Sequence, residues 1–296
     1  MAVYVQFLID VLSLGSLYAL MALGLVIVYG ILKLVNFAYG ELIMVAGYSL
    51  FLLGGTPLPW LVMAAVAVLM AIGAGIATEY AAFRPVRSKS VTAVLITSFA
   101  FSTLLQNAAL LFISPRARTV PLPDIFSDTV VLFGAIIPLR NILTIVAAAI
   151  MLAIFSFIMK KTVLGLAMRA AATKFTMARM LGIPANLVIT SAFALSGLLA
   201  GVVSLFWLGR IGSVVPGIGL EPLLVAFIAT VIGGMRSLQG AVFGGFLLAL
   251  IVTTFNYLLP PELLKFRDAF TFSLVILILL WRPDGLIQGP ATGQRT

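Results

Sequence analysis

The sequence predicts an all-α protein that crosses a membrane several times, and three observations support this fold class. Hydrophobic residues make up 62% of the 296 residues, charged residues make up 9%, and the mean hydropathy is +1.22. A soluble domain carries about a quarter charged residues, because its surface must be hydrated. Several apolar runs also approach the roughly 20 residues that a helix needs to cross a bilayer. We therefore expect a polytopic membrane protein with a single transmembrane domain over residues 1–296.

The helices are expected wherever an apolar run is bounded by glycine, proline or charged residues. The first run, residues 3–29, lacks the charged start and short apolar core of a cleavable signal peptide. The further expected helices cover residues 42–53, 60–83, 91–113, 142–159, 185–207, 220–232, 241–259 and 270–281. The runs 42–53 and 220–232 are short enough to be half-crossings. The sequence is thus compatible with eight or nine transmembrane segments, some of them broken or half helices.

Basic residues indicate how the chain is oriented in the membrane. One cluster contains Arg84, Arg87 and Lys89, and a second lies in the amphipathic segment 160–184, which has no acidic residue. Loops rich in Lys and Arg face the cytoplasm. The proline-punctuated segment 114–138, with a strand-like stretch at 129–134, is then an extracytoplasmic loop, the N-terminus lies outside and the C-terminus inside. The net charge of +9 reflects these loops, and we expect no nucleic-acid partner.

The residue types that are missing exclude several kinds of chemistry. The chain contains no cysteine and no histidine. Their absence excludes disulfides, zinc sites with the usual ligands, and catalytic triads that use imidazole as the base. No G-x-x-x-x-G-K-[ST] motif occurs in the sequence, so the chain has no P-loop. We expect a protein that is not an enzyme and has no catalytic residue, metal site or cofactor.

A polar break interrupts apolar sequence at residues 30–41. Asn36 suits a turn or a helix N-cap, Gly40 tolerates unusual backbone conformations, and an acid such as Glu41 is favoured in the first turn of a helix. The simplest interpretation is a capped helix start. The functional interpretation is a broken helix that lines a translocation path, as in many transporters. Hydrocarbon cannot satisfy free backbone groups, so the break must pack against protein, water or the interface.

Four further polar residues lie in or beside the expected helices. Asp10 and Glu79 are near helix ends, where an interfacial or snorkelling acid is the simplest interpretation. Gln106 and Asn107 lie inside the helix expected at 91–113, and we predict that both hydrogen-bond a neighbouring helix.

Six short motifs carry a resemblance to a known family. They are GSLYALMALG at 15–24, VNFAYGE at 35–41, GLAMRA at 165–170, LGIP at 181–184, VIGGMRSLQG at 231–240 and WRPDGL at 281–286. In this order and spacing the set closely resembles the membrane permease subunits of the branched-chain amino acid ABC importer family, in particular the shorter of its two permeases. The resemblance covers essentially the whole chain.

This resemblance implies the fold, the partners and the location. The chain would be an ABC importer permease that forms half of a translocation path in the bacterial plasma membrane, without catalysis of its own. Its partners would be a second homologous permease, two cytoplasmic ATPases and an extracytoplasmic solute-binding protein. The family's solutes are small and polar, such as branched-chain amino acids, urea, short amides or aromatic acids. The missing P-loop independently requires a separate ATPase if transport is driven by ATP.

The resemblance also implies that residues 160–184 are the cytoplasmic coupling loop, which docks on an ATPase. The loop residues carried over are Gly165, Arg169, Lys174, Arg179, Leu181 and Gly182. Because the three basic residues are five apart, they are scattered around a helix, which fits a helix seated in a protein cleft better than one lying on lipid. Gly165 and Gly182 would bound this short helix.

An alternative function is a self-sufficient channel or secondary carrier for a small solute. An ion-coupled carrier usually needs buried acids or a proton relay. This chain has no histidine, and its only acids beside helix-breaking motifs are Glu41 and Glu221. The sequence therefore favours the ABC permease.

Overall fold

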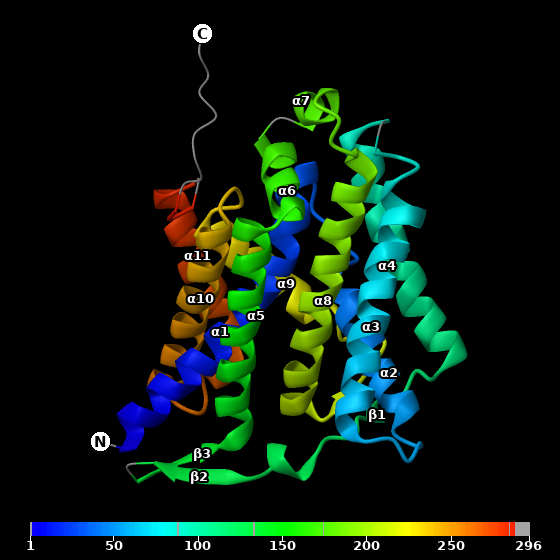
Figure 1. Cartoon of the computed structure of the whole chain (residues 1–296). Coiled ribbons are helices and arrows are strands. Elements are labelled where there is room, and N and C mark those ends of the chain that lie inside the picture. Colours follow the sequence, from blue (N-terminus) through cyan, green and yellow to red (C-terminus); the bar gives the residue numbers. More distant parts are fainter. Residues whose placement is uncertain (1, 88, 133, 174, 284, 288–296) are drawn as a thin grey trace. The chain divides into compact units, whose positions relative to one another are not determined.

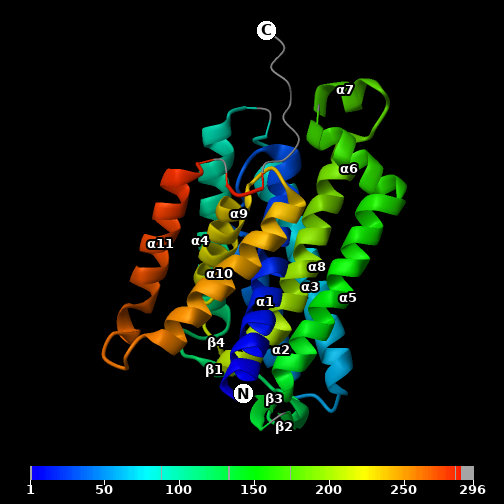
Figure 2. The same cartoon turned by 90° about the vertical axis from the view of Figure 1, so that its left-hand side faces the viewer.

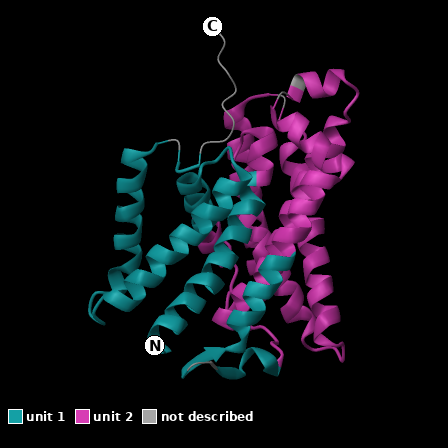
Figure 3. Ribbon diagram, turned by 60° about the vertical axis from the view of Figure 1, so that its left-hand side comes forward, with its two compact units in different colours: residues 1–26, 124–150, 225–296 teal, residues 27–123, 151–224 magenta. Residues whose placement is uncertain are grey.

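The computed structural model describes residues 2–287 except 88, 133, 174 and 284. The chain divides into two compact units, which Figure 3 shows in different colours. Unit 1 comprises residues 1–26, 124–150 and 225–296, and unit 2 comprises residues 27–123 and 151–224. The units are described separately below.

Six helices in the described part of the chain are long and apolar enough to cross a membrane (Figure 1). They are α1 (Ala2–Leu32), α3 (Trp60–Thr78) with its π-helical continuation η1 (Glu79–Phe83), α4 (Val91–Phe112), α5 (Leu139–Lys161), α8 (Ala185–Ile211) and α10 (Leu238–Leu258). The expectation of an all-α polytopic membrane protein is confirmed.

Three further apolar helices are shorter. They are α2 (Tyr39–Leu53), α9 (Leu220–Gly233) and α11 (Arg267–Trp281), and each has 14 or 15 residues. At 1.5 Å per residue these helices are about 21–23 Å long, whereas the hydrocarbon core is about 30 Å thick. Their lengths suit half helices, and the count of eight or nine crossing segments stays a prediction.

Unit 1 contains most of α1, the start of α5, most of α9, and α10 and α11, which pack together (Figure 2). Unit 1 also includes the 3-10 helix η2 (Asp124–Phe126) and a hairpin of β2 (Thr129–Leu132) and β3 (Ala135–Pro138). Another 3-10 helix, η3 (Leu264–Phe266), precedes α11. The strand expected within 129–134 is therefore confirmed. A Cβ atom placed on Gly134 would lie 3.9 Å from that of Ala2, so the hairpin lies beside the start of α1.

Asp10 connects three helices of unit 1. Its Oδ1 atom accepts a hydrogen bond from Nδ2 of Asn141 on α5 at 2.9 Å, and its Oδ2 atom accepts one from the Tyr257 hydroxyl on α10 at 3.0 Å. Both carboxylate oxygens therefore bond other helices of unit 1, and the expectation of an interfacial or snorkelling acid at this position stays a prediction.

Unit 2 is built around the pair α3 and α8, which run side by side, with α2 packed against both (Figure 1). A Cβ atom on Gly75 of α3 would lie 2.6 Å from the Phe193 carbonyl oxygen, and one on Gly197 of α8 would lie 2.5 Å from that of Ala71. The two backbones are therefore in direct contact at these glycines. The Ser204 hydroxyl of α8 also donates to the Ile43 carbonyl of α2 at 2.8 Å.

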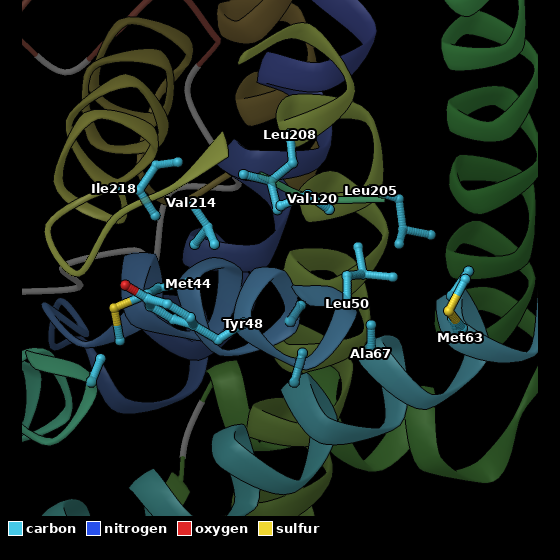
Figure 4. Packing of buried hydrophobic residues seen from close by; sticks show 14 residues of the cluster. Met44, Tyr48, Leu50, Met63, Ala67, Val120, Leu205, Leu208, Val214 and Ile218 are labelled. Atoms are coloured by element: carbon cyan, nitrogen blue, oxygen red, sulfur yellow. The ribbon is translucent and has the colours of Figure 1, made fainter. Parts of the chain in front are cut away.

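The hydrophobic core of unit 2 fills the space between these helices. Figure 4 shows Met44, Tyr48 and Leu50 of α2 packed with residues of α3 and α8 such as Ala67 and Leu208. The two-residue strands β1 (Arg118–Thr119) and β4 (Ser213–Val214) pair in antiparallel fashion and place Val120 and Val214 in the same cluster. This ladder fixes the chain after the end of α8.

Candidate functional site

The polar break predicted between the first two helices is confirmed. Helix α1 ends at Leu32 and α2 begins at Tyr39. The first residue after α1, Lys33, has φ = 57°, the left-handed conformation that non-glycine residues seldom adopt. Asn36 forms a turn, because its Oδ1 atom accepts a hydrogen bond from the Ala38 N–H at 3.0 Å. The alternative role of Asn36 as the N-cap of α2 is wrong, since that position is Ala38.

Glu41 lies in the first turn of α2 and is 1% exposed. Its Oε1 atom accepts hydrogen bonds from Gln106 Nε2 at 2.7 Å and from the Ser102 hydroxyl at 3.1 Å, both on α4. The contact predicted between Gln106 and a neighbouring helix is confirmed. The same prediction for Asn107 is wrong, because its Nδ2 atom donates to the Thr103 carbonyl of its own helix at 2.8 Å.

Three polar atoms around the break are buried and have no hydrogen-bond partner among the described residues. They are Asn36 Nδ2, the Tyr39 hydroxyl and Glu41 Oε2, on residues that are 1%, 0% and 1% exposed. Buried polar groups in proteins are nearly always paired, with protein or with ordered water. Each of these three atoms, an amide donor, a hydroxyl and a carboxylate oxygen, is therefore a group that water or a small solute would complete.

Gly40 allows two chain segments of unit 2 to meet at this break. A Cβ atom on Gly40 would lie 2.0 Å from the carbonyl oxygen of Gly219, and one on Gly219 would lie 2.5 Å from the Gly40 carbonyl. Gly219 directly precedes α9, just as Gly40 lies at the start of α2. The two short helices thus begin at one backbone contact. Gly219 was not among the residues predicted from the sequence, and only its place before a short apolar run could have indicated it.

Glu79 forms a second buried polar cluster in unit 2. It is 0% exposed, and its carboxylate bonds Arg84 Nη2 at 2.8 Å, Arg84 Nε at 3.1 Å and the Thr190 hydroxyl at 3.1 Å. Arg87 lies 3.5 Å from the same carboxylate and also donates to Asn186 at the start of α8. The expectation of a snorkelling acid is wrong for Glu79. Its hydrogen bonds raise the pKa of Arg84, which therefore stays charged.

The expected coupling segment contains two short helices, α6 (Val163–Thr173) and α7 (Phe175–Met180), where one was expected. Lys174 lies outside the described residues. A Cβ atom on Gly165 would lie 2.3 Å from the Ile158 carbonyl, so α6 turns tightly against the end of α5.

Gly182 ends α7 with φ = 85°, a conformation that glycine adopts without steric cost. The Gly182 N–H bonds the Arg179 carbonyl and the Ile183 N–H bonds the Ala178 carbonyl, each at 3.1 Å, which is a Schellman motif. Gly182 therefore ends the helical part of the segment, as the sequence predicted, whereas the prediction that Gly165 marks the other boundary is wrong, because α6 begins at Val163 and contains Gly165. The exposed side chains of the segment include Val163 (84%), Met180 (81%) and Leu181 (83%). Arg169 and Arg179 are also exposed.

These features place the chain among polytopic helical membrane proteins that have a broken helix and a buried polar site. Comparison with known families is more specific. The family model "Branched-chain amino acid transport system / permease component" matches residues 7–280. The chain belongs to this permease family.

Curated relatives match over nearly the whole chain. The high-affinity branched-chain amino acid transport system permease BraD of Pseudomonas aeruginosa is 32% identical over 300 residues, which cover 97% of this chain and 96% of BraD. The corresponding permease LivH of Escherichia coli K12 is 33% identical over 302 residues, with the same coverage. A probable LivH of Methanocaldococcus jannaschii is 27% identical over 92% of this chain and 89% of its own length.

Membership in this family determines the general role of the chain. It is a permease subunit of an ABC importer and a multi-pass protein of the bacterial inner membrane. The subunit is not catalytic, and a separate partner hydrolyses ATP. The family also implies a solute-binding protein as a partner.

Proposed function

We propose that residues 1–296 form one permease domain, which supplies half of the translocation path for a branched-chain amino acid. The other half comes from a second homologous permease, in a heterodimer that carries two ATPases and receives solute from one extracytoplasmic binding protein. The names of BraD and LivH, each aligned with 97% of this chain, support this substrate class. The observation that carries the proposal is the incomplete polar site at the α1–α2 break.

Asn36, Gly40 and Glu41 line the path in this proposal. A branched-chain amino acid has an apolar side chain, but its ammonium and carboxylate groups need polar partners inside a bilayer. Glu41 Oε2 can accept from an ammonium group and Asn36 Nδ2 can donate to a carboxylate, and neither has a partner among the described residues. The backbone contact between Gly40 and Gly219 leaves no space for a side chain, so the path is closed at this level.

Residues 160–184 are the cytoplasmic segment that contacts an ATPase in this proposal, and residues 114–138 lie outside. The exposed apolar side chains of Val163, Met180 and Leu181 suit a protein contact better than water. The cationic side chains Arg169 and Arg179 flank them, and no acidic residue occurs from 151 to 220. An ATPase surface with acidic and apolar groups would complement this segment.

Reconstitution tests the proposal directly. Proteoliposomes that contain this permease, its partner permease and the ATPases should take up radiolabelled leucine only with ATP and the binding protein. The double variant Arg169→Asp/Leu181→Asp should insert normally but lose most ATP-dependent uptake and ATPase assembly. The matched control is Arg116→Asp/Leu58→Asp. It changes two exposed residues of unit 2 that lie outside the segment 160–184, and it should keep ATPase assembly. Uptake by this chain alone, indifferent to ATP, would instead establish the channel or carrier.

A further inference from the structure

Unit 2 contains a cavity of about 840 Å³ at the end where α8 begins. Figure 1 shows α7 at this same end of unit 2. The lining comes from segments that are far apart in sequence: the end of α1, the loop after η1, α7 and the start of α8. A volume of this size lies within the range of about 300–1,000 Å³ that small-molecule sites occupy.

The charge of the lining is uniformly positive. Lys33, Arg87 and Arg179 line the cavity, and none of the described lining residues is acidic. The acid bonded to Arg87 is Glu79, whose carboxylate is shared with Arg84. Like charges that line one hollow repel one another, and an anion bound there lowers this repulsion.

The remaining wall of the cavity is apolar. Ile31, Phe175, Ile183 and Ile189 contribute hydrocarbon surface next to the three cations. A small inorganic anion would leave this surface against water, whereas an amphiphile with an anionic head would cover it. The apolar wall therefore favours a lipid over free phosphate.

Local structure fixes the backbone that carries Lys33 and the guanidinium group of Arg87. The backbone of Lys33 is fixed in the left-handed conformation that ends α1, and its N–H bonds the Tyr29 carbonyl at 2.7 Å. The Arg87 guanidinium is positioned by the carboxylate of Glu79 and by Asn186. The Arg87 guanidinium therefore needs little further ordering when an anion binds, which favours affinity.

We propose that this cavity binds the phosphodiester headgroup of an anionic phospholipid from the cytoplasmic leaflet. Basic pockets between membrane helices on the cytoplasmic side bind such headgroups. The choice of the cytoplasmic leaflet depends on the membrane orientation proposed above. The location of the binding site depends only on the residues that line the cavity. Lys33 and Arg179 bind the phosphate together with Arg87, and the apolar wall packs against the glycerol and the first part of the acyl chains.

Native mass spectrometry of the purified permease, without ATPases, tests the site. The variant Lys33→Asn/Arg179→Gln removes two cations, and asparagine tolerates the left-handed conformation at position 33. Each cation near an anionic lipid surface contributes roughly fivefold to binding, so phosphatidylglycerol should bind roughly 25-fold more weakly. The control Lys160→Gln/Lys161→Gln removes two charges outside the cavity and should bind within about twofold of wild type. Melting temperatures measured without lipid should be the same for all three proteins.

Several results would overturn the proposal. The first is an equal loss of phosphatidylglycerol binding in both double variants. The second is equal binding of phosphatidylglycerol and phosphatidylcholine by the wild-type permease. The third is binding of inorganic phosphate as tight as that of the lipid. If the lipid is released when the ATPases assemble, the cavity is part of the surface that contacts an ATPase, and the proposed lipid site is wrong. Because lipid binding is measured without ATP or solute, it can succeed or fail independently of the transport assay.

Discussion

Unit 2 buries two carboxylates, Glu41 and Glu79, to the same degree but surrounds them differently. Their exposed fractions are 1% and 0%. Glu79 bonds two arginines and the hydroxyl of Thr190. Among the described residues, the donors to Glu41 are the neutral groups of Gln106 and Ser102, and both bond the same oxygen.

The difference separates a structural acid from a candidate functional one. The folded chain itself supplies the positive charges and donors that Glu79 needs, so its burial is compensated. The second oxygen of Glu41 has no partner in the described part of the chain. A buried carboxylate in that condition is costly unless something else completes it, and a transported ammonium group is of the right charge. The four predictions below test this contrast.

The largest loss of stability is expected for Glu79→Ala. It leaves Arg84 and Arg87 without their carboxylate, and breaking a buried ion pair costs about 3–5 kcal/mol. Since these arginine side chains are 33% and 22% exposed, we expect about 3 kcal/mol, at the lower end. Thermal unfolding of the purified protein measures the loss. An equal loss for Glu262→Ala, at an exposed acid, would contradict the structural role.

Gly40→Ala should have the next largest effect. Its Cβ atom would lie 2.0 Å from the carbonyl oxygen of Gly219, and backbone at that distance must move. Overpacking of this kind costs about 1–3 kcal/mol, and transport should fall at least tenfold. The matched control is Gly73→Ala in α3, where nothing lies within 4 Å of the added atom. Equal tolerance at positions 40 and 73 would disprove the close contact.

Glu41→Gln should separate transport from stability. Glutamine has the same shape and removes the charge, so the melting temperature should change little while leucine uptake falls at least tenfold. Glu262→Gln serves as the control at an exposed acid and should transport normally. The opposite result would be a melting temperature for Glu41→Gln as low as that of Glu79→Ala, with unchanged uptake per folded protein. Glu41 would then have a structural role, as Glu79 does.

The smallest effect is expected for Ser102→Ala. The serine donates one of the two hydrogen bonds to Glu41, and such bonds between membrane helices are worth about 0.6 kcal/mol. Ser98→Ala on the same helix removes only a bond to the Leu95 carbonyl and provides the comparison. We expect a modest rise in the transport KM for Ser102→Ala alone. A larger change for Ser98→Ala would show that Ser102 does not act through Glu41.

The α1–α2 break could be predicted because its signals are local. Asn36 and Gly40 are turn residues inside apolar sequence, and the chain does turn there. The end of the segment 160–184 was predictable for the same reason, since Gly182 occupies a left-handed position that a side chain would strain, whereas Gly165 lies inside α6.

The pairing of Glu79 was missed because it depends on a π-helical turn. In an α-helix, residues three and four apart share a face, whereas Arg84 is five residues from Glu79. In η1 the Arg84 N–H bonds the Glu79 carbonyl at 2.7 Å, the i to i+5 pattern of a π-helix, which brings the two side chains together. No local pattern in the sequence had indicated this turn.

Contacts between distant segments were also beyond the sequence. A helix contact could be predicted for Gln106, but not that its partner is Glu41, 65 residues away. Asn107 follows Gln106 on the same helix and points about 100° away, so both could not face one neighbour. The cavity near Lys33 and Arg179 likewise depends on how the ends of separate helices meet.

The glycine contacts between α3 and α8 have a mechanical consequence. Where Gly75 and Gly197 meet, no side chain separates the two backbones, so neither helix can rotate about its own axis without a collision. A force applied near Asn186, where α8 begins, is therefore transmitted to α3 as a tilt of the pair. Because Ser204 also bonds α2, we expect the break at Gly40 to be displaced with them. The close contact between α3 and α8 would then couple the start of α8 mechanically to the break at Gly40.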